Sequence, residues 1–91
     1  MASIYNSTSN TLRLGTSNAD FIENSSGKYV TILAQGGNDT IENHRRGSNS
    51  YIDGGESDDN IYNIGENVTI IGGVGNDKIS LSSYAENVLI K

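Results

Sequence analysis

Four aspartates recur along the chain at nearly constant intervals, and carboxylates at a fixed spacing are candidates for binding a cation. They are Asp20, Asp39, Asp59 and Asp77, which lie 19, 20 and 18 residues apart. An isoleucine follows each of them two positions later, and glycines gather just before them, most densely in GGVGND at residues 72 to 77. One such stretch is an ordinary tight turn, but four in phase require a repeating scaffold that brings the carboxylates together.

The intervals predict a scaffold of short stacked strands. β-Branched segments precede most of the aspartate copies, namely YVTIL at 29 to 33, SYI at 50 to 52 and VTII at 68 to 71, and VLI at 88 to 90 begins a further one. Each unit therefore holds two strands joined by a glycine-rich corner and by a looser polar corner. One coil cannot bury its apolar side chains, whereas stacked coils can. We expect an all-β, right-handed parallel β-solenoid, or β-roll, of about four coils of roughly 18 to 20 residues.

Residues 1 to 11 carry no repeat and are expected to cap the β-roll domain of residues 12 to 91, with coils at about 12–30, 31–50, 51–68 and 69–88. Period-two alternation predicts which side chains point inward. These are Val30, Ile32, Val68, Ile70, Val88 and Ile90 on one strand of each coil, and Ile22, Ile41, Ile61 and Ile79 on the other. Two positions after the isoleucines come Asn24, Asn43 and Asn63. This column either stacks as a ladder of side-chain amides or suits a left-handed corner conformation.

Composition limits the classes of function. Only 34% of the residues are apolar, 11 are glycine and none is proline or cysteine, so a repeating core or a bound ligand must compensate for a composition close to that of disordered chains. The lack of cysteine excludes disulfides and thiolate metal sites. A net charge of −5 argues against nucleic acid or an anionic membrane surface as a partner. No apolar run is long enough to insert across a membrane.

The pattern Gly-Gly-x-Gly-x-Asp-x-Ile is complete at residues 72 to 79. It resembles the nonapeptide of the repeats-in-toxin (RTX) family, the hemolysin-type calcium-binding repeats, and the resemblance covers about residues 12 to 90. The motif residues kept by the earlier copies are Gly54, Gly55 and Asp59 in the third, Gly37 and Asp39 in the second, and Gly15 and Asp20 in the first. The family commonly carries the motif at both corners of each coil. Here one corner has it, so we expect one column of ions.

The resemblance implies that Ca²⁺ binds between corresponding corners of successive coils and that binding is coupled to folding. Calcium takes six to eight oxygen ligands, and glycines let main-chain carbonyls turn toward one point. Aspartates one strand spacing apart, about 4.8 Å, repel unless a cation lies between them. The candidate ligands are Asp20, Asp39, Asp59, Asp77 and the carbonyls of Gly36, Gly54, Gly72, Glu56 and Val74. Up to three sites are expected, the last being the best and the first the poorest.

Other interpretations stay open. The same corners could be turn chemistry alone, in a metal-independent structural or adhesive solenoid that self-associates through its edge at residues 88 to 90, unless further coils follow there. We do not expect an enzyme, because the single histidine, His44, lies in a polar corner as a solvated group and no serine has the context of a nucleophile. By resemblance the protein is secreted or at the cell surface, although MASIYNSTSN lacks the regions of a signal peptide.

Overall fold

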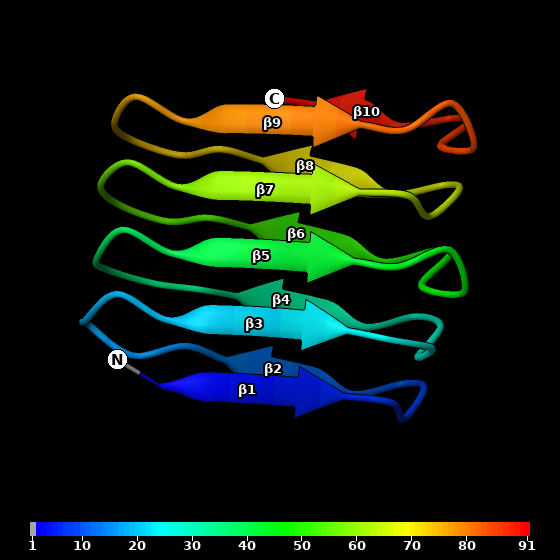
Figure 1. Cartoon of the computed structure of the whole chain (residues 1–91), viewed down its shortest axis with the longest axis horizontal. Helices are drawn as coiled ribbons and strands as arrows, with labels where there is room; N and C mark the ends of the chain where they lie inside the picture. Colours follow the sequence, from blue (N-terminus) through cyan, green and yellow to red (C-terminus); the bar gives the residue numbers. More distant parts are fainter. Residues whose placement is uncertain (1) are drawn as a thin grey trace.

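The computed structural model describes residues 2 to 91 as a right-handed parallel β-solenoid whose coils stack into two five-stranded sheets (Figure 1). Every strand pairs in parallel with its equivalent in the next coil, so the predicted fold is confirmed. The first sheet contains, in order, β1 (Ser3–Asn6), β3 (Phe21–Asn24), β5 (Thr40–Asn43), β7 (Asn60–Asn63) and β9 (Lys78–Leu81). The second contains β2 (Leu12–Leu14), β4 (Thr31–Leu33), β6 (Tyr51–Asp53), β8 (Thr69–Ile71) and β10 (Leu89–Ile90).

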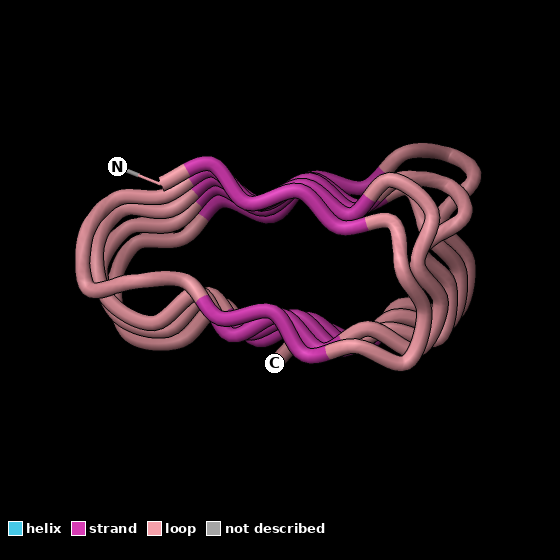
Figure 2. The backbone as a smooth tube through the Cα atoms, turned by 90° about the horizontal axis from the view of Figure 1, so that it is seen from below, coloured by secondary structure: helices cyan, strands magenta, loops and turns pink. Residues whose placement is uncertain are grey.

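The core is the narrow space between the two sheets, seen down the stack in Figure 2. Equivalent isoleucines pair across each sheet, as Ile22 does with Ile41, and Ile52 with Ile70. The fully buried aliphatic side chains are Ile22, Val30, Ile32, Ala34, Ile41, Ile52, Ile61, Val68 and Ile70. The inward assignments are therefore confirmed along the stack. At its end Ile79 and Val88 are only partly buried and Ile90 is 46% exposed, because no described coil covers them.

The first residues add a coil to the four that the aspartates mark. Ser3–Asn6 pairs in register with β3, so that Ile4 lies beside Ile22 and Asn6 beside Asn24. The segment predicted as a cap without repeat thus contributes a strand to the sheet. Its signal in the sequence is the Ile-x-Asn spacing at residues 4 to 6, which recurs at 22 to 24.

The asparagine column forms the side-chain ladder rather than a left-handed turn. The Nδ2 of Asn24 donates to Oδ1 of Asn43 at 2.8 Å, and Asn43 donates likewise to Asn63 at 2.7 Å. Each amide also bonds the main chain of the polar corner in its own coil, as Asn43 Nδ2 does with the Gly47 carbonyl. The left-handed asparagines belong to another column, just before the strands of the second sheet; they are Asn10, Asn49, Asn67 and Asn87.

Candidate functional site

The four predicted aspartates stack at the glycine-rich corners, on the left in Figure 1. Each stands immediately before a strand of the first sheet, and the strand register places them one above another. Asp20, Asp39 and Asp59 are buried, whereas Asp77 in the last such corner is partly exposed. The fold therefore brings all four carboxylates into one column.

The corner backbone keeps its form where the glycines are missing. Two positions in each of the last three corners have positive φ, a region that disfavours side chains. In the fourth corner both of these positions are glycine, Gly73 and Gly75. In the second corner Gln35 adopts a φ of 72° at one of them, and in the third corner Ser57 adopts a φ of 77°. The first corner has no positive φ. The degenerate second and third copies thus share the geometry of the complete fourth copy, and the first does not.

Successive aspartates are joined by hydrogen bonds along the column. The main-chain N–H of Asp20 donates to Oδ1 of Asp39, and that of Asp39 donates to Oδ1 of Asp59, both at 2.8 Å. The N–H of Asp59 donates to Oδ1 of Asp77 at 2.9 Å. One oxygen of each carboxylate is therefore committed to the preceding coil, an arrangement that the spacing in the sequence did not reveal.

In two of the aspartates the second carboxylate oxygen makes no hydrogen bond within the described residues. Oδ2 of Asp39 and Oδ2 of Asp59 are shut off from solvent and have no hydrogen-bond partner within residues 2 to 91. A Cβ atom on Gly54 would lie 2.8 Å from Oδ2 of Asp59 and 2.9 Å from the carbonyl oxygen of Gly72, one coil further on. The missing side chain of Gly54 thus leaves a space toward which oxygens of two neighbouring coils converge. Unpaired buried oxygens of this kind call for a partner.

Burial, with the neighbouring carboxylates in the same column, sets the charge state of the inner aspartates. It raises the pKa of Asp39 to about 6 and that of Asp59 to about 7, from an ordinary 3.8. A nearby cation would oppose both causes, because it favours the ionised form.

Asp20 differs because both of its oxygens are already bonded. Burial alone would raise its pKa, but the N–H groups of Thr16 and Ala2 and the Thr16 hydroxyl donate to the carboxylate and hold the pKa below its usual value. This carboxylate has the least capacity left for a further ligand. It also lies in the one corner of the four that has no positive φ.

The predicted carbonyl ligands fall into two groups. Gly54 and Gly72 occupy the first corner position, directly beside the aspartate of their own coil. The other three, Gly36, Glu56 and Val74, share the third position at the outer rim, where Val74 is 75% exposed. No hydrogen bond from within residues 2 to 91 reaches any of these five carbonyl oxygens. The structure brings the first group next to the carboxylates and leaves the second on the outside.

One cluster was missed in the sequence. His44, expected as a solvated group, has its Nε2 atom 2.9 Å from Oε2 of Glu23 in the neighbouring coil. Residues 23 and 42 face each other in the register of β3 and β5, which the repeat itself could have indicated. Ring orientation, however, has no signature in the sequence.

In comparisons with known proteins, no family model, curated protein or solved structure matches the chain. No helix within residues 2 to 91 is long and apolar enough to cross a membrane.

Proposed function

We propose that this protein is a non-catalytic calcium-binding β-roll module, part of a secreted or cell-surface protein, whose folding is coupled to Ca²⁺. The observation that carries the proposal is the buried Oδ2 of Asp59, which has no hydrogen-bond partner within residues 2 to 91 and faces the open side of Gly54 beside the Gly72 carbonyl. The resemblance of residues 72 to 79 to the RTX repeat supports the same ion. Carboxylate and carbonyl oxygens are the donors that calcium prefers.

The residues that would hold the ion come from adjacent corners. Between the third and fourth corners these are the carboxylates of Asp59 and Asp77 and the carbonyls of Gly54 and Gly72. Between the second and third corners Asp39 and Asp59 contribute, but Ala34 stands where Gly54 stands one coil later, and its methyl group fills the equivalent space. The pair formed by Asp20 and Asp39 is the poorest, because Asp20 has no free oxygen.

Coupling to folding follows from charge burial. Two of the three buried carboxylates in the column, those of Asp39 and Asp59, cost free energy when ionised, because burial disfavours their charged form. When bound, Ca²⁺ supplies the compensating charge and the missing partner for the orphaned oxygens. Because the unfolded chain cannot present such a site, binding adds directly to the free energy of unfolding.

The test is a far-UV circular dichroism titration of chelator-stripped protein with Ca²⁺, with Mg²⁺ as the control ion. We expect a calcium-specific gain in β signal or thermal stability that Asp59→Asn and Asp77→Asn reduce at least tenfold in apparent affinity. The matched control is Asp58→Asn, which removes the same charge next to the column from an exposed side chain. Equal calcium responses in all three variants would overturn the proposal.

A second candidate function rests on the aspartate hydrogen bonds. Because Oδ1 of each inner aspartate already accepts a main-chain N–H, protonated carboxyl groups could close the column without metal. The protein would then be a metal-independent structural or adhesive solenoid. A β spectrum in chelator that does not respond to calcium supports this alternative.

A further inference from the structure

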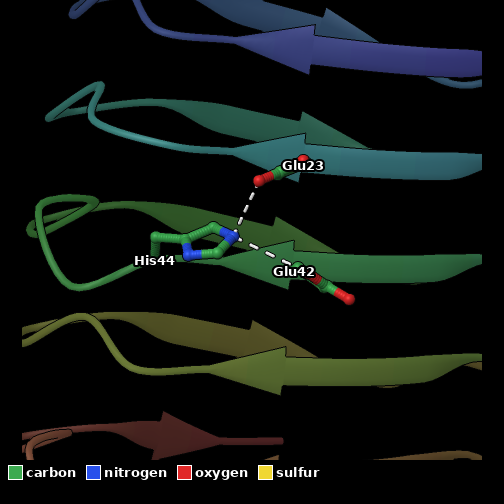
Figure 3. A group of neighbouring side chains, drawn as sticks. All are labelled: Glu23, Glu42 and His44. Carbon is green, nitrogen blue, oxygen red and sulfur yellow. Dashed lines mark ion pairs between the residues drawn. The ribbon is translucent and has the colours of Figure 1, made fainter.

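A second cluster of possible metal ligands lies far from the aspartate column, on the outer face of the first sheet. Figure 3 shows the ring of His44 pointing at the carboxylates of Glu23 and Glu42, which come from neighbouring strands. Glu23 is on β3 and Glu42 on β5, and His44 follows β5 as the chain enters the polar corner. The cluster therefore sits toward the corner opposite the glycine-rich one and joins two coils.

The ligand atoms lie close enough together to converge on one small ion. Nε2 of His44 is 2.9 Å from Oε2 of Glu23 and 3.6 Å from Oε1 of Glu42. One ligand atom from each residue can be chosen so that all lie within 4.8 Å of one another. Zinc bound at about 2.0 to 2.2 Å sets its tetrahedral ligands roughly 3.3 to 3.6 Å apart. The distance to Glu42 agrees with that range, and the distance to Glu23 would lengthen by a few tenths of an ångström on binding.

The histidine nitrogen is directed at the two carboxylates and away from solvent. Nε2 lies within ion-pair distance of Glu23 and Glu42, yet no hydrogen bond satisfies this shielded atom within residues 2 to 91. A shielded imidazole nitrogen aimed between two carboxylates brings three potential ligand atoms together, and imidazole is a common metal ligand in proteins.

The two glutamates supply a further reason for a cation. Glu23 and Glu42 are direct partners in the parallel register of β3 and β5. Like charges at directly opposed positions destabilise a sheet. The adjacent basic residue is directed elsewhere, since the guanidinium of Arg45 lies over the ring of Tyr84, 4.7 Å from its centroid. The negative charge of the two glutamates is therefore available to be balanced by His44 or by a bound ion.

We propose that Glu23, Glu42 and His44 form a divalent transition-metal site of the zinc type that links two adjacent coils. One imidazole nitrogen and two carboxylate oxygens match Zn²⁺ rather than Ca²⁺, which takes oxygen ligands. The three side chains are each partly exposed, so water can complete the coordination. The site is independent of the calcium proposal, because it shares no residue with the aspartate column.

The experiment is a titration of the whole chain with ZnSO₄ in excess Ca²⁺, followed by calorimetry and by NMR of the imidazole. His44 is the only histidine, so its ring signals report this site alone. We expect one equivalent of Zn²⁺ to shift those signals, and His44→Gln, Glu23→Gln and Glu42→Gln each to weaken binding at least tenfold. Glu66→Gln, which removes an exposed glutamate from the next polar corner, is the control and should bind as the parent does.

Thermal unfolding gives a second readout that does not depend on the ring signals. Zn²⁺ should raise the Tm of the parent and of Asp59→Asn, and should not raise that of His44→Gln. Imidazole signals that stay in place at saturating zinc overturn the proposal. So does zinc binding that is lost in Asp59→Asn but kept in His44→Gln, since that pattern places the ion at the glycine-rich corner.

Discussion

Gly54 and Asp59 are in such close opposition that a Cβ atom on the glycine would lie 2.8 Å from Oδ2 of the aspartate. Gly54 has no positive φ, so its backbone does not require glycine. The residue is small because of what lies beside it. A methyl group at this position would press on the carboxylate oxygen.

Gly54→Ala should therefore lower calcium affinity by at least tenfold, about 1.4 kcal/mol, because the added methyl group occupies the space between Asp59 and the Gly72 carbonyl. Calorimetric titration measures this. In an Asp59→Asn background the same substitution should have little further effect on calcium binding, which separates loss of the site from general damage. The reverse change, Ala34→Gly, should strengthen binding at the preceding corner. Parent-like affinity in Gly54→Ala contradicts this account.

The chelator-treated protein should lose stability as pH rises from about 4 to about 7. In the folded state burial and neighbouring carboxylates raise the pKa of Asp39 to about 6 and that of Asp59 to about 7, against 3.8 for the ordinary group. The folded chain then holds protons that the unfolded chain has lost, so the free energy of unfolding falls across this interval and levels off above it. Urea unfolding in buffers from pH 4.5 to 8 measures the slope.

Asp59→Asn serves as the control for that slope, because the amide cannot ionise and still offers an oxygen to the Asp39 N–H. It should flatten the upper part of the pH dependence. With saturating calcium the slope should flatten in the parent protein, since the carboxylates are then ionised both in the ion-bound folded state and in the unfolded chain. Metal-free stability that increases between pH 5 and 7 is inconsistent with these pKa directions.

Asn43→Ala should be among the most destabilising single substitutions in the chain. It leaves Asn24 Nδ2 and Asn63 Oδ1 without their partner in the ladder and also removes the bond to the Gly47 carbonyl. Each buried group left unpaired costs about 1 to 3 kcal/mol. Asn76→Ala, at an exposed corner position, should cost less than about 0.5 kcal/mol. Chemical denaturation of the two variants compares them directly, and similar midpoints would count against the ladder.

The last coil should mediate self-association of the isolated chain. Its strand β10 pairs with β8 on one side only, and Leu89 and Ile90 are about half exposed. An unpaired strand edge with apolar side chains favours pairing with another copy. Ile90→Lys should shift sedimentation velocity profiles toward monomer, whereas Tyr62→Lys, exposed on β7 with a paired strand on either side, should not. A parent chain that stays monomeric at high concentration rules this out.

Much of the fold could be predicted because two residue types, aspartate and isoleucine, recur in phase along the sequence. The aspartates and the isoleucines two positions later fix the coil length and the inward face of the first sheet. Period two then placed Ile32 and Ile70 in the core, where they are fully buried. A stack of equivalent coils leaves little freedom once period and face are known.

The sites were less predictable because side-chain direction depends on local geometry. The aspartate spacing indicated a column but not that Oδ1 of Asp59 accepts the N–H of Asp39. The asparagine column admitted two interpretations, and only the structure separates Asn43 in the ladder from Asn49 in the left-handed turn. His44 was missed for the same reason, because its role depends on which way the ring points out of the polar corner.

The direction of the asparagine ladder has a mechanical consequence. Its amide bonds, like the main-chain bonds of both sheets, run along the stack, and residues 2 and 91 lie at opposite ends of it (Figure 1). Tension applied between those ends pulls in line with these bonds, so the load falls on one terminal coil at a time. The module should extend by peeling, in steps of one coil. An ion bound between two coils would raise the force needed to separate them.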